Sequence, residues 1–178
     1  MGSKKSIDKY FSSVIAAVGL LYEKQFYGQM LILIYSAIDS MGLLDAELTQ
    51  TNASGVTFQK WVKKYILPHT GIEFSEVDFW GARCGVLHTF TAESGLSKQG
   101  KARQIQYYSG PKDSQKALAF VKNARSFENG KHVPARIEDV LEAFLGAMKI
   151  FPDHLLNNCT ENSAYETRLN KVLQQYSL

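Results

Sequence analysis

Apolar residues recur at helical spacing along most of the chain, which predicts a series of amphipathic helices. The periodicity predicts a first helix over residues 6–23 and a second over residues 27–45. In the second, the run from Met30 to Leu44 is apolar on nearly all sides, a pattern typical of a helix surrounded by others. A third, short helix is expected to begin with Thr57 at its cap and to stop before Pro68.

A fourth helix is predicted to open at Ser75, because Asp78 follows three residues later and the two residue types form a capping box. Its inner face is expected to be the side that carries the apolar residues. These are Val77, Trp80, Cys84 and Leu87.

The segment from Gly95 to Gly110 lacks helical periodicity and contains Gln104 to Tyr108, which favours a short strand. Residues Lys131 to Val133 could pair with it. The second half otherwise predicts three more helices. We expect one that Asp113 caps and that runs to Ala124, one with apolar positions from Ile137 to Phe151 that Pro152 ends, and one over Ser163 to Tyr176. The predicted fold is therefore all-α, a bundle of about five to seven helices that could include a short β-hairpin.

Composition is that of a globular protein, with 45% hydrophobic and 21% charged residues among 178, so we expect a single domain over residues 1–178. The net charge of +3 permits contact with phosphates without demanding it. Two cysteines, Cys84 and Cys159, favour a reducing compartment over a disulfide framework, which predicts a cytoplasmic location. The run Met30 to Leu44 is too short to span a bilayer, so no membrane contact is expected.

The predicted fourth helix carries Arg83 and His88 with four residues between them, in a segment that is otherwise apolar or small. This R-x4-H pattern resembles the motif of the HEPN ribonucleases (higher eukaryotes and prokaryotes nucleotide-binding domains). The runs YSAIDSMGLLD, FQKWVKKYILP and FWGARCGVLHTFTAES are similar to a helical bacterial branch of that group. The resemblance covers roughly residues 7–108, and it implies an all-α fold in which the motif lies near the end of a core helix.

The two residue types suit RNA cleavage by the neighbouring 2′-hydroxyl. Histidine exchanges protons near neutral pH, and arginine stays charged and offers a planar fork to phosphate oxygens without a metal. Arg83 and His88 are five residues apart, so they point about 140° away from each other on a helix. The resemblance implies that two protomers bring their motifs together across a dimer interface. We therefore expect a homodimeric, metal-independent endoribonuclease of toxin or antiphage type, with no cofactor and with an antitoxin or other protein as a further partner.

One position departs from the family pattern. Catalytic members usually carry Asn, Asp or His directly after the arginine, where this chain has Cys84. The alternative function is a non-catalytic HEPN-like module that binds RNA, nucleotide or a protein. A third interpretation is a structural adaptor, in which Arg83 pairs with Asp39 or Asp78 and His88 makes a hydrogen bond in the core.

Further candidates lie around the motif. Cations and aromatic residues downstream of His88 form a combination that can bind a phosphate backbone and stack bases, or else cover a solvated hairpin. These predicted RNA-binding residues are Lys98, Lys101, Arg103 and Tyr107. Asp39 lies in the most apolar helix and is expected to meet a cation or a hydrogen-bond donor, for which Arg83 is a candidate. Glu93 could orient His88 or lie at the surface. A second match to the motif, Arg125 and His132, flanks a predicted turn and is discounted.

Overall fold

The computed structural model describes residues 2–172, which form eight α-helices, seven of them with at least seven residues, and a small parallel sheet. The mainly helical fold class predicted from periodicity is thereby confirmed. The elements follow the chain as α1 (Gly2–Glu23), α2 (Tyr27–Asp45), α3 (Gly55–Tyr65), α4 (Glu76–Thr89), α5 (Gly95–Lys98), β1 (Gln104–Tyr108), α6 (Gln115–Ser126), the 3₁₀ turn η1 (Phe127–Gly130), β2 (His132–Arg136), α7 (Ile137–Glu161) and α8 (Ser163–Leu169).

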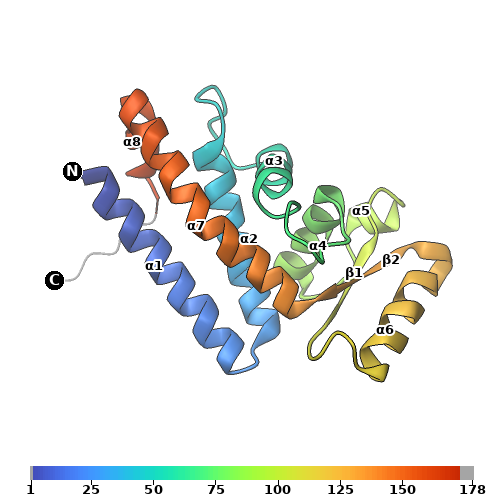
Figure 1. The fold of residues 1–178 in the computed structure, drawn as a ribbon. Coiled ribbons are helices and arrows are strands. Elements are labelled where there is room, and N and C mark those ends of the chain that lie inside the picture. Colours follow the sequence, from blue (N-terminus) through green and yellow to red (C-terminus); the bar gives the residue numbers. More distant parts are fainter. Residues whose placement is uncertain (1, 173–178) are drawn as a thin grey trace.

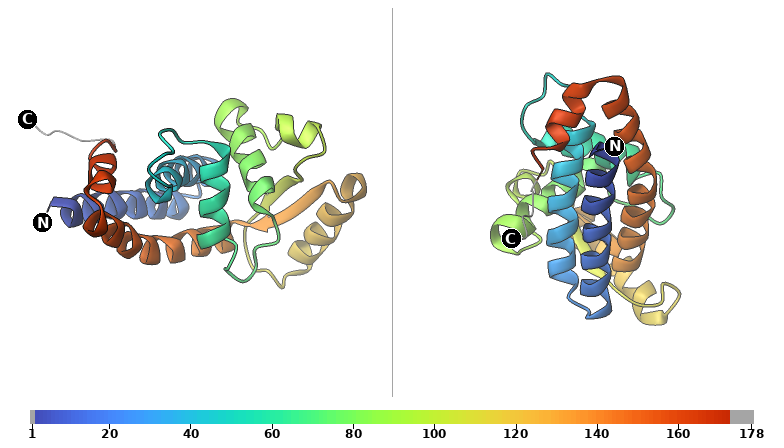
Figure 2. Two further views of the ribbon diagram at one scale, coloured as in Figure 1. Left: turned by 90° about the horizontal axis from the view of Figure 1, so that it is seen from above. Right: turned by 90° about the vertical axis from the view of Figure 1, so that its left-hand side faces the viewer.

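The three longest helices, α1, α2 and α7, all pack against one another (Figure 1). Figure 2 shows them side by side in its right-hand view, with α8 at the end near the N-terminus. α3 and α4 pack against α2, and the sheet with α6 lies at the opposite end of α7 from α8. Because each of these three helices contributes apolar side chains to one continuous core, they and the helices packed on them are held together by shared burial.

α2 is the central helix, and nine of its residues are buried, including Ile34, Ile38 and Met41. The predicted bounds of this helix are confirmed. By length and composition, the 19 residues of α2 would be enough to cross a membrane. The expectation that this segment is too short counted only the apolar run from Met30 to Leu44, which is shorter than the helix. Core helices of soluble proteins pass the same test, and here α1, α3, α4, α7 and α8 contact α2.

The two strands pair in parallel, with Gln104 opposite His132 and Tyr108 opposite Arg136. The expected pairing of the two segments is confirmed, but they do not form a hairpin. A parallel pair needs a crossover connection, and α6 supplies it. Ile105, Val133 and Ala135 face the core, which attaches the sheet to the helices.

Several helix ends differ from those predicted, and α1 begins at Gly2 where residue 6 was expected. Ser54, not Thr57, caps α3, and Thr57 occupies the third helical position of the same capping box. Ser114, not Asp113, caps α6 by accepting a hydrogen bond from the backbone of Ala117. The last helix ends at Leu169. The part of its predicted range beyond residue 172 lies outside the described residues.

Pro152 does not end α7, which continues to Glu161. Proline inside a helix removes a hydrogen bond and its ring crowds the preceding turn, at a cost of about 3 kcal/mol. Phe151 and Leu155 are fully buried on either side of it, and Cys159 is buried one turn further on. The apolar stripe therefore continues past the proline, and its burial offsets the local cost.

Candidate functional site

α4 begins with the capping box predicted from the sequence. The backbone N–H of Ser75 donates to Asp78 Oδ2 at 2.9 Å, and the backbone N–H of Asp78 donates to Ser75 Oγ at 3.2 Å. The Asp78 carboxylate is buried and also accepts hydrogen bonds from the backbone and guanidinium of Arg103. Burial alone would raise the pKa of Asp78, but the hydrogen bonds from Ser75 and Arg103 lower it below its ordinary value. The start of α4 is thus fixed to the strand that follows it.

Arg83 in the middle of α4 pairs with Asp39 on α2, as expected from the sequence. Its Nε and Nη2 donate to Asp39 Oδ2 at 2.9 and 2.6 Å. Both side chains are largely buried, with 20% of Arg83 and 16% of Asp39 exposed, and the guanidinium carbon lies 4.9 Å from the centre of the Trp80 ring. A pair this sheltered holds its partners in one geometry, so the guanidinium has a fixed direction.

His88 lies in the last turn of α4 and is exposed. Within residues 2–172 its imidazole makes no hydrogen bond or ion pair. The core hydrogen bond considered for it is absent from this part of the chain. An exposed, unengaged imidazole at the end of a helix is accessible to a ligand in solvent.

The most buried face of α4 differs from the one predicted. Its buried residues are Asp78, Phe79, Gly81, Ala82 and Gly85, whereas the expected inner residues are only partly buried. The reason is close backbone packing, because a Cβ on Gly85 would come within 2.6 Å of the carbonyl oxygen of Thr91. The segment after α4 therefore packs directly on the backbone of α4 at Gly85, where a larger residue would not fit.

The predicted inner residues form a partly buried apolar strip along α4, which we call the α4 stripe and which consists of Val77, Trp80, Cys84 and Leu87. Trp80 and Leu87 pack against the core, and the Trp80 ring also contacts Phe58 of α3. Arg83 and His88 flank the stripe. The spacing of three, four and three residues between its members is that of the seam through which two helices pair in a coiled coil. Burial raises the pKa of the Cys84 thiol, while the adjacent Arg83 partly lowers it.

The predicted RNA-binding residues lie in different environments. Lys98 pairs with Glu93 at 3.0 Å, so within the described residues Glu93 contacts this lysine and not His88. Arg103 is held by Asp78, and the Tyr107 hydroxyl is hydrogen-bonded to that of Tyr35. Burial raises the pKa of Tyr107 well above its ordinary value.

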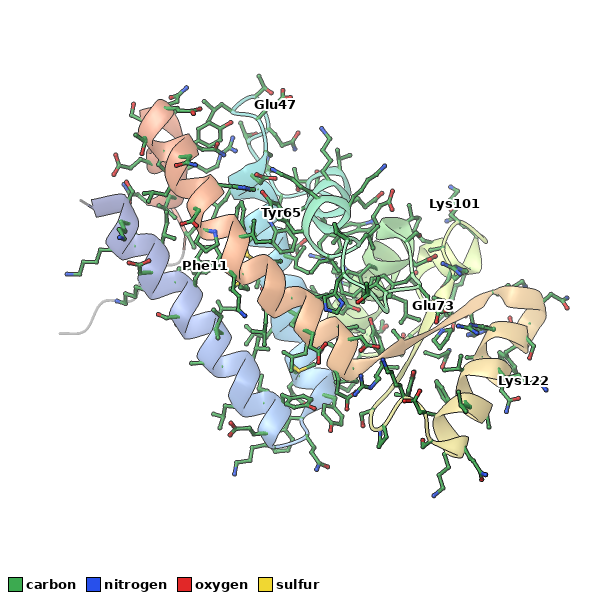
Figure 3. The ribbon with its side chains drawn as sticks, in the orientation of Figure 1. Phe11, Glu47, Tyr65, Glu73, Lys101 and Lys122 are labelled. Carbon is green, nitrogen blue, oxygen red and sulfur yellow. The ribbon has the colours of Figure 1, made fainter. Side chains whose placement is uncertain are left out.

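Lys101 is exposed, and its ammonium group has no partner between residues 2 and 172. Figure 3 labels it near α5, at the end of the molecule away from Phe11. Of the four candidates, it is therefore the cation that is available to a phosphate without breaking a contact seen in the described part of the chain.

The second match to the motif is not assembled as a site. Arg125 pairs with Glu73 at 2.6 Å, and His132 is buried on β2 beside Gln106, with its Nδ1 2.8 Å from the Gln106 amide nitrogen. Residues 2–172 contain no group of three or more His, Cys, Asp or Glu side chains that could hold a metal ion.

Comparisons with family models, with curated proteins and with solved structures find no match to this chain. The candidate site therefore rests on its own geometry. It comprises a fixed arginine, a free histidine and an apolar stripe between them.

Proposed function

We propose that the chain is a metal-independent endoribonuclease of the HEPN type that acts as a homodimer through α4. The observation that carries this proposal is the free, exposed His88 on the same helix as Arg83, which Asp39 holds in one direction. A histidine that exchanges protons and an arginine that stays charged are the two groups that RNA cleavage by a 2′-hydroxyl requires.

In this reaction the 2′-oxygen forms a bond to phosphorus while the bond from phosphorus to the 5′-oxygen breaks. One group takes the proton of the 2′-hydroxyl and another returns a proton to the leaving 5′-oxygen, which yields a 2′,3′-cyclic phosphate and a 5′-hydroxyl. A symmetric dimer has two equivalent sites, and in each of them one His88 imidazole makes one of these proton transfers while water makes the other. Arg83 stabilises the charge that develops on the phosphate oxygens.

The α4 stripe is the surface through which we expect the protomers to meet. All four residues of the stripe are only partly buried within one chain, so they gain further burial when two such stripes pack together. In parallel helices paired along a seam of this spacing, a flanking residue lies beside the residue five positions later on the other helix. Arg83 of one protomer would then lie beside the partner subunit's His88, although within one chain the two point in different directions.

A specific observation also favours the alternative, a non-catalytic module that binds RNA, nucleotide or a protein. Two nitrogen atoms of Arg83 are already engaged by Asp39, and Cys84 occupies the position after the arginine. If Arg83 serves only to join α2 to α4, the helical fold is kept but no arginine is available to stabilise the charge on a phosphate. A toxin or antiphage role, with an antitoxin as partner in the cytoplasm, belongs to the catalytic proposal.

The test is cleavage of a mixed RNA pool in EDTA by the wild-type protein and by His88→Ala, with cyclic-phosphate ends assayed on the products. His154→Ala is the matched control, because His154 is also exposed but lies on α7. Cleavage that survives in the control and is lost in His88→Ala supports the ribonuclease. If the folded wild-type dimer cleaves nothing but still binds RNA, the catalytic proposal is wrong and the binding module is favoured.

A further inference from the structure

Phe90 ends α4 in a backbone conformation that phenylalanine rarely adopts. Its φ of 54° and ψ of 34° lie in the left-handed region, where the end of a helix usually carries glycine. The side chain is 59% exposed, so burial of the ring in the core does not compensate for the strain. Strained residues of this kind are concentrated at functional sites, where the surrounding structure holds them in place.

The ring of Phe90 lies against the first turn of α2. A Cβ on Gly28 would come within 2.6 Å of Phe90 Cζ, so the glycine makes room for the ring. Within residues 2–172 no other aromatic ring stacks on Phe90. The outward side of the ring is therefore an open, flat, apolar surface whose position is set by α2.

The surroundings of the ring suit a nucleotide. His88 is two residues earlier, so the two Cα atoms are at most about 7.6 Å apart. The start of α2 has no side-chain cap at Phe26 and no acidic residue in its first turn, which leaves the positive end of the helix dipole beside the ring. An aromatic face next to positive potential complements a nucleobase and its phosphate.

We infer that Phe90 stacks the base next to the bond that is cut. This inference rests on the proposed function and deepens it, because it names the substrate as RNA whose base at that bond is unpaired. A base inside a duplex is covered on both faces by its neighbours and cannot reach a protein ring, whereas a base in a loop or single strand can. Phe90 is thus a specificity residue, distinct from the groups that move protons.

The experiment uses the full chain and a labelled single-stranded RNA that the wild type cuts, together with the same RNA lacking the base on either side of the cut bond. Phe90→Ala removes the ring, Phe90→Trp retains a stacking surface and Phe90→Leu retains apolar bulk alone. Loss of one base-stacking ring costs about 1–3 kcal/mol, so Phe90→Ala and Phe90→Leu should raise KM about 5- to 150-fold. Phe90→Trp should restore the wild-type KM. Phe127→Ala, at a ring that is 58% exposed beyond α6, should leave KM unchanged.

The outcomes separate this inference from the proposed function. If the wild type cuts no RNA, the proposed function fails and the inference fails with it. If the wild type cuts RNA and Phe90→Ala has the same KM, only the inference is overturned. It is also overturned if Phe90→Ala lowers the oligomeric mass, because the ring would then belong to the protein interface. In its favour, removing the base at one side of the cut should weaken wild-type cleavage and leave Phe90→Ala unaffected.

Discussion

The carboxylate of Asp39 on α2 accepts two hydrogen bonds from Arg83 on α4, and both end on the same oxygen, Oδ2. The pair joins the central helix of the core to the helix that carries the candidate site. The guanidinium of Arg83 also makes a cation–π contact with the ring of Trp80. The direction of Arg83 therefore depends on the packing of α2 against α4.

Asp39→Asn should destabilise the fold by about 2 kcal/mol, because it leaves a largely buried guanidinium without its counter-charge. The matched control is Glu93→Gln, which weakens an ion pair with Lys98 in which both side chains are more than half exposed, and it should cost about 0.5 kcal/mol. Urea unfolding of the two variants at neutral pH measures both values. Equal losses would mean that Asp39 and Arg83 contribute no more than a surface pair.

The Asp39–Arg83 pair was predictable because an unpaired carboxylate in an apolar helix is costly, and few cations lie in equally apolar segments. The bounds of α2 followed from periodicity, and the start of α4 followed from the Ser75 and Asp78 capping box. These features are local in sequence or have one dominant physical cause. They were therefore accessible without a structure.

The inner face of α4 was not predictable from hydrophobicity, since Gly81 and Gly85 contribute almost no apolar surface of their own. Their four-residue spacing was the available signal, because two small residues one turn apart allow a backbone to pack closely. The parallel sheet had a comparable signal in the helix predicted between the two strands, since a helical crossover goes with parallel pairing. The partners of Arg103 and Tyr107 come from distant segments, which periodicity does not report.

The stability of the protein should fall as the pH drops below about 4, and Asp78 should account for part of that loss. Its pKa in the folded chain is lowered from an ordinary value of 3.8, so its contribution is fully present above that value. The contribution is lost as the pH falls through the lower folded value. Urea midpoints measured from pH 6 downward should therefore decline less steeply in Asp78→Asn than in the wild type. The exposed Asp113→Asn is the control, and a decline as shallow as that of Asp78→Asn would contradict the assignment.

The Tyr35 and Tyr107 hydroxyls should be coupled, because each is the hydrogen-bond partner of the other between α2 and β1. Tyr107→Phe leaves the buried Tyr35 hydroxyl unsatisfied and should cost about 1–3 kcal/mol. In the double variant Tyr35→Phe, Tyr107→Phe neither hydroxyl remains, so its loss should be clearly smaller than the sum of the two single losses. A double-mutant cycle by urea unfolding measures the coupling, and strict additivity would show that the bond contributes nothing.

Tyr107→Phe also tests the RNA-binding role predicted for this residue. A hydroxyl engaged in the interior should not contact RNA, so the affinity of the folded variant for single-stranded RNA should equal that of the wild type. Lys101→Ala should weaken binding and reduce its dependence on salt, because Lys101 is an exposed cation. Equal effects of the two substitutions on RNA affinity would contradict this difference.

Cys84 should report how two copies of α4 meet. It lies in the middle of the α4 stripe, and in a symmetric, parallel pairing a seam residue faces its own copy across the two-fold axis. Mild oxidation should then produce a covalent dimer, seen without reductant on a denaturing gel. Because burial raises the pKa of the Cys84 thiol, the reaction should be faster at mildly alkaline pH, where more thiolate is present.

Cys84→Ser should abolish the covalent dimer and Cys159→Ser should not, since Cys159 is buried on α7. A non-covalent dimer that resists crosslinking in the wild type would indicate that α4 pairs in another direction or that a different surface forms the interface.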